Sequence, residues 1–187
     1  MCFVTNVQKH TLYFGNILKK EIVNACKCAD ILITTGAVSV GKKDIIPVVL
    51  EDLGAETIFK RVNIQPGTPT MASMLNGTPV LSLSGNPYAA IANFELYFWS
   101  IVAKMMHSDS FDVIIEEAIL ASEYNKVNKL KRLIRANAKD GKVYLPSSVH
   151  SSSVIHNLAD CNCFIELEAG RMVSIGDKVT IRYIKGI

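Results

Sequence analysis

The segment that most constrains the fold is Ile31–Thr35, a short run in which every residue is apolar or β-branched. It shows no alternation of apolar and polar residues, a pattern typical of a strand buried on both faces of a parallel sheet. A loop that contains Gly36 and Gly41 follows, and Asp44 then stands where a helix N-cap is expected. A strand that leads through a small-residue loop into a helix predicts an α/β layer fold.

The residues around this run supply the other elements of an α/β domain. Apolar positions at helical spacing predict helices, short β-branched runs predict strands, and Asn76-Gly77 predicts a hairpin turn. At most, Leu12–Asn16 supplies one strand ahead of the first helix. The expected helices are 17–29, 44–53 and 88–106, and the expected strands are 31–35, 57–64, 70–75 and 79–83.

Beyond residue 107 the pattern changes to short strands without a long helix. Asp140-Gly141 predicts another hairpin turn, and the Ser/His-rich stretch Ser147–His156 predicts a loop. We therefore expect a boundary near residues 106–110, between an α/β domain at 1–107 and a small all-β domain at 108–187. The expected strands of the second domain are 112–115, 131–138, 142–145, 163–167 and 178–183.

Composition excludes several classes of protein. Of the 187 residues 49% are apolar and 20% charged, which excludes a disordered or collagen-like chain. The net charge of +3 is too small to predict a nucleic-acid partner. The five cysteines include two C-x-C pairs, which do not have the spacing of zinc ligands, and an odd count suits a reducing compartment. The most apolar stretch, Ala89–Met106, is interrupted by Asn93 and Glu95, and no signal peptide is recognisable, so we expect a cytoplasmic protein.

Two loops share one design. Thr35–Gly41 and Ser84–Pro87 each follow a buried strand and precede a helix. In an open α/β sheet such loops form the ligand crevice, and small residues beside a helix N-terminus suit a phosphate or another oxyanion. A third loop, Gln65–Pro69, contains Pro66-Gly67 and by itself predicts only a turn.

Asp44 has two interpretations. As the residue before a helix it can be an N-cap, and as a carboxylate beside an oxyanion loop it can hold Mg²⁺ together with water and a substrate phosphate. The spacing alone leaves both open.

Together these motifs resemble the MoeA/gephyrin E-domain family of molybdopterin molybdenumtransferases. The similarity is specific from about Asp30 to Met106 and weaker from Lys131 to Tyr183. The resemblance implies a MogA-like three-layer α/β/α domain, N-terminally incomplete, at 1–107, followed by a small β-barrel like MoeA domain IV at 108–187. The matching segments are Asp30–Asp44, Leu53–Glu56, Pro66–Pro69, Gly85–Pro87, Asp140-Gly141, Leu167–Gly170 and Gly176–Val179.

The chemistry follows as an implication of this resemblance. Family members bind adenylylated molybdopterin, insert molybdate and release AMP in an Mg²⁺-dependent step. The resemblance therefore implies Mg²⁺ as cofactor, adenylylated molybdopterin and molybdate as substrates, Asp44 as metal ligand, and Asp44 and Ser39 as catalytic residues. The implied cofactor-binding residues are Thr35, Gly36, Ala37, Ser39, Gly41, Pro66, Gly67, Ser84, Gly85, Asn86 and Pro87.

The chain departs from the family pattern at three positions. Ala37 stands where the family has a second glycine, Gln65 replaces the lysine of a Lys-Pro-Gly motif, and Ser84 replaces a proline. A neutral glutamine cannot supply the Coulomb attraction of a lysine for phosphate. These departures bear on turnover more than on fold.

The resemblance also concerns what lies outside the chain. Family members carry two further domains upstream, so we expect either a truncated fragment or a natural minimal form. A homodimer and a MogA-type adenylyltransferase are implied partners, whereas nucleic acid and membrane are not. The alternative function is a non-catalytic scaffold like the gephyrin E domain, which captures peptides through its C-terminal domain. A MogA- or CinA-type enzyme is a third possibility, disfavoured by the all-β C-terminal part.

Overall fold

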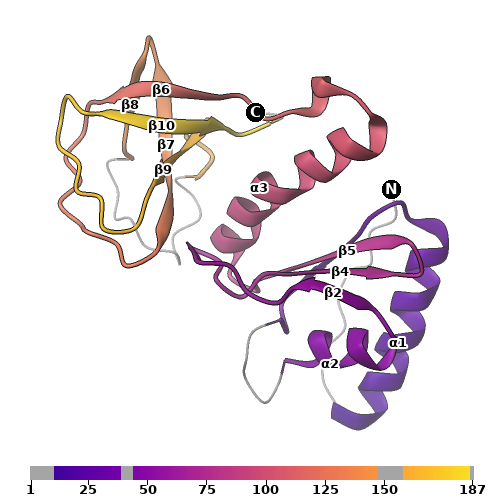
Figure 1. The fold of residues 1–187 in the computed structure, drawn as a ribbon. Helices are drawn as coiled ribbons and strands as arrows, with labels where there is room; N and C mark the ends of the chain where they lie inside the picture. Colours follow the sequence, from indigo (N-terminus) through magenta and orange to yellow (C-terminus); the bar gives the residue numbers. More distant parts are fainter. Residues whose placement is uncertain (1–10, 39–43, 147–157, 186–187) are drawn as a thin grey trace. The chain divides into compact units, whose positions relative to one another are not determined.

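The computed structural model describes residues 11–38, 44–146 and 158–185. Their Cα positions form two compact units (Figure 1). The first unit holds the described residues up to Val62 together with Pro69–Gly85, and the second holds Asn63–Thr68 and the described residues from Asn86 onward.

The first unit is built on a four-stranded sheet in the order β1-β5-β4-β2. β1 and β5 are parallel, while β5–β4 and β4–β2 are antiparallel. The β4–β5 hairpin turns at Asn76-Gly77, whose φ angles of 50° and 82° confirm the predicted turn. The bounds are β1 Leu32–Thr35, β2 Glu56–Phe59, β4 Met71–Leu75 and β5 Thr78–Leu83.

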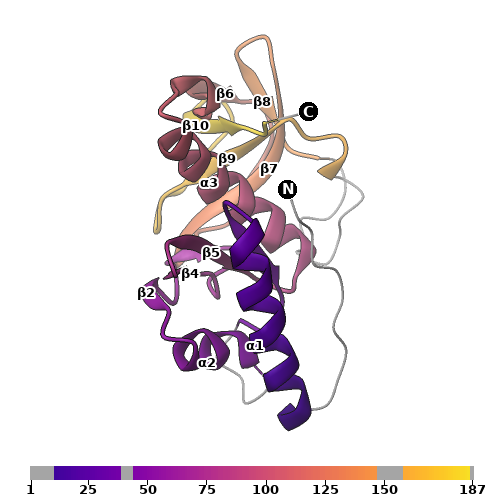
Figure 2. The same cartoon turned by 90° about the vertical axis from the view of Figure 1, so that its right-hand side faces the viewer.

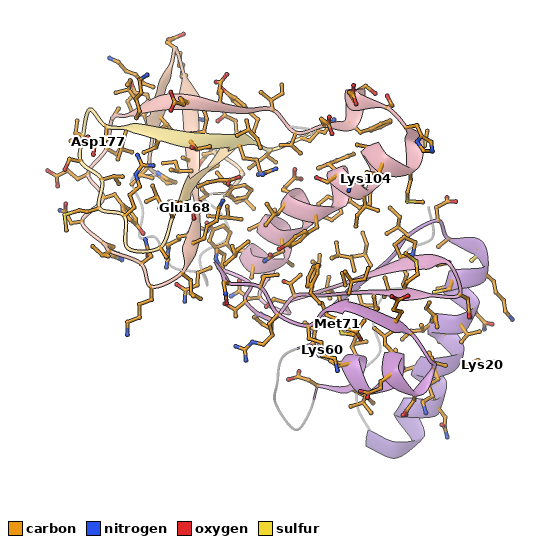
Figure 3. The ribbon with its side chains drawn as sticks, in the orientation of Figure 1. Lys20, Lys60, Met71, Lys104, Glu168 and Asp177 are labelled. Atoms are coloured by element: carbon orange, nitrogen blue, oxygen red, sulfur yellow. The ribbon has the colours of Figure 1, made fainter. Side chains whose placement is uncertain are left out.

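Two helices cover one side of this sheet, α1 (Thr11–Cys28) and α2 (Ile45–Asp52), as Figures 1 and 2 show. Met71, labelled in Figure 3, is 1% exposed and lies in the core that the helices and the sheet share. The Thr78 hydroxyl donates to the Cys26 carbonyl, which joins β5 to the end of α1. The buried members of this core are Ile22, Ala25, Leu32, Val38, Ile46, Val49, Leu50, Met71, Leu75 and Val80.

The second unit contains a closed five-stranded barrel. Its strands pair around the ring in the order β7-β8-β6-β10-β9, and β9 closes the ring on β7. The short strand β3 (Ile64–Gln65) pairs in parallel with the start of β7. Asp140-Gly141 turns the β7–β8 hairpin, as predicted. The barrel strands are β6 Ile115–Leu120, β7 Lys131–Lys139, β8 Lys142–Tyr144, β9 Cys163–Leu167 and β10 Lys178–Tyr183.

The long helix α3 (Pro87–Met106) packs within this second unit. The Tyr88 hydroxyl donates to the Leu133 carbonyl of β7 and accepts from the Arg135 amide, which fixes the first turn of the helix on the barrel. Phe164 of β9 joins the same apolar cluster, so β9 is buried on its outer as well as its inner face. A short 3₁₀ turn, Asp109–Phe111, follows the helix. The domain boundary predicted at 106–110 stays a prediction. The division into compact units is a separate observation, in which the chain passes from the first unit to the second at Gly85–Asn86.

Three element predictions are wrong in detail. Leu12–Asn16 is not a strand but the beginning of α1, because a short apolar run cannot by itself be distinguished from part of a helix. The strand expected at 57–64 is two strands, β2 and β3, which pair in different sheets. The strand expected at 112–115 begins only at Ile115, since its acidic residues hide the strand pattern. The predicted loop 147–156 lies outside the described residues.

Cross-strand contacts of its acidic residues help to explain why β6 is a strand. The Tyr183 hydroxyl donates to Glu116, and the Lys178 ammonium lies 3.4 Å from a Glu117 carboxylate oxygen. Both partners stand on β10, the antiparallel neighbour of β6, so cross-strand pairs hold a strand whose own sequence is acidic. No helix within the described ranges is long and apolar enough to cross a membrane.

Candidate functional site

The carboxyl ends of β1 and β5 bring two of the predicted loops together. Thr35 pairs with Leu83 in the parallel register, so the chain leaves both strands at the same edge of the sheet. The Gly36 amide donates to the Leu83 carbonyl at 2.9 Å. A Cβ added to Gly85 would lie 3.2 Å from the Cα of Gly36, closer than nine in ten real Cβ contacts. The two loops therefore meet backbone to backbone, and only very small residues fit between them.

Ala37 takes a conformation that favours glycine. Its φ of 52° lies in the left-handed region, which costs an alanine roughly 1–2 kcal/mol. Its carbonyl accepts from the Ile46 amide at 3.1 Å, which ties the loop to the first turn of α2. The predicted neighbours Ser39 and Gly41 lie outside the described residues.

Asp44 is the N-cap residue of α2, as its position in the sequence predicts. Its backbone is extended, with φ −88° and ψ 91°, but its side chain makes no capping hydrogen bond. The capping interpretation of the carboxylate is therefore not realised. No cluster of three His, Cys, Asp or Glu side chains in the described part of the chain could hold a metal by itself. A carboxylate of this kind fits Mg²⁺, which keeps most of its waters and is commonly shared between one or two carboxylates and substrate phosphates.

The Pro66-Gly67 loop lies in the second unit and is held by α3. Asn93 is fully buried, and its Nδ2 donates to the Pro66 carbonyl at 3.1 Å and to the Ala89 carbonyl at 2.9 Å. A Cβ added to Gly67 would lie 1.7 Å from that Nδ2, and the φ of Gly67 is +99°. The loop therefore requires glycine, and Asn93 fixes its path. In the sequence Asn93 stands out only because it interrupts an apolar stretch. Its contact with the Pro66-Gly67 loop is revealed by the structure alone.

Asn86 and Pro87 begin α3. The Asn86 side chain accepts from the Ala89 amide at 3.0 Å, and Pro87 occupies the first helical position, where its missing N–H costs nothing. The predicted Gly-Asn-Pro motif thus acts as a helix start. Ser84 and Gly85 precede it at the end of β5.

Gln65, which precedes this loop, stands opposite an arginine. The parallel register pairs Gln65 of β3 with Arg132 of β7, and Arg132 Nη1 donates to Gln65 Oε1 at 3.5 Å. The sequence could not show this pairing, because the two residues lie far apart along the chain.

The cysteines do not form a metal site among the residues that the structure describes. Cys163 is buried in the barrel core and Cys161 is buried just before β9, and burial raises the pKa of the Cys161 thiol to about 11 and of the Cys163 thiol to about 12. Both are therefore protonated, unreactive thiols at neutral pH. Cys26 and Cys28, near the end of α1, are also free thiols.

The structure places the predicted site residues in two groups, one in each compact unit. Within the first unit the loops after β1 and β5 meet, and Asp44 opens the helix that follows the first loop. Within the second unit the Pro66-Gly67 loop packs on α3 near its amino end. The first group is Thr35, Gly36, Ala37, Asp44, Ser84 and Gly85, and the second is Pro66, Gly67, Asn86 and Pro87.

Comparison with known proteins accounts for both units. Residues 15–104 match the family described as "Probable molybdopterin binding domain", and residues 117–182 match the family described as "MoeA C-terminal region (domain IV)". A molybdopterin molybdenumtransferase of Bacillus subtilis is 37% identical over 168 residues, which cover 85% of this chain and 39% of the relative. The corresponding protein of Staphylococcus aureus strain COL is 34% identical over 170 residues, 89% of this chain and 40% of the relative.

A solved structure supports the fold. A molybdopterin biosynthesis MoeA protein of Pyrococcus horikoshii superposes with a TM-score of 0.69 at 23% identity, covering 91% of this chain and 41% of that one. The chain thus spans about 40% of the length of the relatives that it matches. With a mixed α/β unit, a closed barrel and both family matches in place, the chain belongs to the MoeA family, of which it represents the part formed by the molybdopterin-binding domain and the C-terminal region.

Proposed function

We propose that this chain acts in molybdenum cofactor biosynthesis, by binding adenylylated molybdopterin and supporting the insertion of molybdate with Mg²⁺-dependent release of AMP. The observation that carries the proposal is the close approach of Gly36 and Gly85 at the carboxyl ends of two neighbouring parallel strands. Such an edge is where open α/β sheets bind ligands, and bare backbone lets a phosphate or an oxyanion approach the peptide N–H groups. The relatives' name, molybdopterin molybdenumtransferase, supports molybdopterin and molybdenum as the substrates, and the adenylyl group is part of the proposal.

Within this proposal each group of residues has a task. The loops after β1 and β5 bind the anionic substrate through backbone N–H groups, and Ser39 and Gly41 complete the first loop. Asp44, which precedes α2 and follows the first loop, would hold Mg²⁺ through its carboxylate oxygens. The ion, when bound, neutralises charge on the phosphoanhydride and favours departure of AMP. Pro66 and Gly67, in the second unit, are proposed as further substrate-binding residues, and Asn93 fixes the path of their loop.

The test is AMP release from adenylylated molybdopterin in the presence of molybdate and Mg²⁺. The Asp44→Asn variant should lose AMP release by at least tenfold while its thermal unfolding stays close to that of the parent chain. Asp30→Asn is the matched control, because Asp30 is exposed and precedes β1 at the opposite end of that strand. Equal activity in both variants would contradict the role of Asp44.

Binding separates this function from the scaffold alternative. The proposal requires that the folded chain bind adenylylated molybdopterin more tightly with Mg²⁺ than with EDTA. A folded chain that binds no adenylylated pterin under either condition would favour a non-catalytic scaffold.

A further inference from the structure

A positive charge stands beside the Pro66-Gly67 loop, although the loop itself supplies none. Gln65 is neutral, and its register partner across β3 and β7 is Arg132. Partners in a parallel register lie side by side, and the guanidinium of Arg132 reaches the Gln65 carboxamide oxygen at 3.5 Å. A contact of this length to an uncharged oxygen is a weak hydrogen bond, so it leaves most of the charge of the guanidinium uncompensated.

Two other cations of this sheet, Lys131 and Arg182, are already paired with carboxylates. Lys131, the preceding residue, lies 2.7 Å from Glu166 and 3.0 Å from Glu168. Arg182 lies 2.6 Å from the second oxygen of Glu166. In the part of the chain that the structure describes, no carboxylate lies within salt-bridge distance of Arg132. Arg132 is therefore a cation beside this loop that no described carboxylate neutralises, so its charge is available to an anionic ligand.

The charge of Arg132 also acts on the start of α3. Burial raises the pKa of the Tyr88 hydroxyl to about 12, and the positive charges of Arg135 and Arg132 oppose that rise. Tyr88 stands in the first turn of α3, where the helix dipole is positive as well. Asn93 joins the Pro66-Gly67 loop to α3, and Arg132 contacts Gln65 at the start of that loop, so these parts of the second unit lie close together.

We propose that Arg132 is a substrate-binding residue, which contacts a phosphate oxygen of the adenylylated pterin at the Pro66-Gly67 loop and supplies the charge that Gln65 lacks. This inference rests on the proposed function and adds to it a specific residue. A guanidinium suits the task, because its planar fork can donate two parallel hydrogen bonds to one phosphate. With Gln65 Oε1 accepting from Arg132, the Nε2 of Gln65 remains a donor for the same anion.

The experiment compares four variants in equilibrium binding of adenylylated molybdopterin at low and moderate salt. Arg132→Gln removes the charge, Arg132→Lys keeps the charge without the fork, and Gln65→Lys with Arg132→Gln moves the charge to the neighbouring strand. Lys129→Gln is the control, because Lys129 is exposed and close in sequence and loses the same charge. Thermal unfolding of each variant shows whether the fold is kept.

Arg132→Gln should weaken binding about tenfold, with a shallower dependence on salt, because one phosphate contact is lost. Arg132→Lys should lie between the parent chain and Arg132→Gln. The relocated charge in the double variant should restore most of the affinity, and Lys129→Gln should bind like the parent chain. Arg132→Gln binding as tightly as Lys129→Gln, or a double variant no tighter than Arg132→Gln alone, would overturn the inference.

A second probe, inorganic pyrophosphate, separates this inference from the proposed function. Weak pyrophosphate binding that is lost in Arg132→Gln, in a chain that does not bind the adenylylated pterin, would overturn the proposed function and the pterin contact, and would leave Arg132 as a binding residue for another phosphate-bearing ligand. Pterin binding that is independent of Arg132 would support the function and overturn the contact. Absence of binding to both ligands would overturn both.

Discussion

Gly36 and Gly85 meet so closely that a Cβ on Gly85 would lie 3.2 Å from the Cα of Gly36. The neighbour at that distance is backbone, which cannot rotate away as a flexible side chain would. The two strand ends must therefore separate if position 85 carries a side chain. The same contact that shapes the proposed anion site is thus a packing constraint of the sheet.

The first prediction is that Gly85→Ala destabilises the chain by about 1–3 kcal/mol, the usual cost of forcing a methyl group into a packed contact. Gly15→Ala is the matched control, since Gly15 lies within α1 and its added Cβ would come no closer than 3.8 Å to another atom. Because glycine is unfavourable inside a helix, this control should be stabilising by about 0.5–1 kcal/mol. Denaturant unfolding measures both, and equal shifts of the same sign would contradict the packing argument.

At Ala37 the opposite substitution, alanine to glycine, is predicted to increase the stability of the chain. Its φ of 52° is strained for alanine and free for glycine, so Ala37→Gly should stabilise the chain by up to about 1 kcal/mol. Ala37→Val should be destabilising, because a β-branched residue tolerates this region least. Melting temperatures of the three chains test the ranking, and a destabilised glycine variant would show that the loop does not hold this conformation in solution.

Asn93 is predicted to support the Pro66-Gly67 loop. Asn93→Ala removes the donor to the Pro66 carbonyl and leaves a small cavity, which should cost about 1–3 kcal/mol. Asn125→Ala is the control, since Asn125 is exposed and should tolerate the change within about 0.5 kcal/mol. Gly67→Ala should be at least as damaging as Asn93→Ala, because the added Cβ would collide with Asn93 Nδ2. Unfolding midpoints give the order, and a neutral Gly67→Ala would contradict the contact.

The contributions of Glu166 and Glu95 to the stability of the fold should change with pH in opposite directions. Burial alone would raise the pKa of Glu166, but hydrogen bonds from Lys131 and Arg182 outweigh it and hold the pKa below its usual value. For Glu95 burial dominates and raises the pKa, against hydrogen bonds from the Lys185 amide and Trp99. A depressed carboxyl pKa stabilises the fold above the ordinary pKa and loses that effect as pH falls. A carboxyl group whose pKa is raised, such as that of Glu95, stabilises the fold at low pH and loses that effect as pH rises.

The variants follow from these signs. At pH 7 Glu166→Gln should be destabilising, by about 1.5–3 kcal/mol for the lost charged hydrogen bonds, and the penalty should shrink below pH 4. Glu95→Gln should be neutral or stabilising at pH 7, because an amide oxygen can accept the same two hydrogen bonds without a buried charge. Denaturation curves at pH 7 and below pH 4 test this pair. A Glu166→Gln penalty that grows towards acid pH would contradict the assignment.

Much of the fold could be predicted because local rules governed it. Asn76-Gly77 and Asp140-Gly141 both turn hairpins with positive φ angles, as the turn chemistry requires. β9 and β10 have the bounds that the sequence predicted, Cys163–Leu167 and Lys178–Tyr183. β6 was misplaced because Glu116 and Glu117 are stabilised by partners on β10, a cross-strand effect that no local pattern contains.

Some residues of the candidate site could be predicted from the sequence, and others could not. Asp44 and the glycines stand in motifs that are contiguous in sequence, so they could be assigned from it. Asn93 and Arg132 could not be assigned from the sequence. Asn93 contacts a residue 27 positions away along the chain, and Arg132 contacts one 67 positions away. Their roles depend on helix packing and strand register, which the sequence does not display. The place of α3 in the second unit was likewise hidden, because it depends on contacts between Tyr88 and the far-off strand β7.

The most direct test of the account is to map where adenylylated molybdopterin binds, by amide chemical-shift changes in the isotope-labelled chain with Mg²⁺ present. The account predicts that the largest changes fall on Gly36, Ala37 and Gly85, with further changes at Gly67 and Arg132, and that the first three are reduced in Asp44→Asn. Changes confined to the far end of the barrel, around Asp140-Gly141, with none at Gly36 or Gly85, would contradict it.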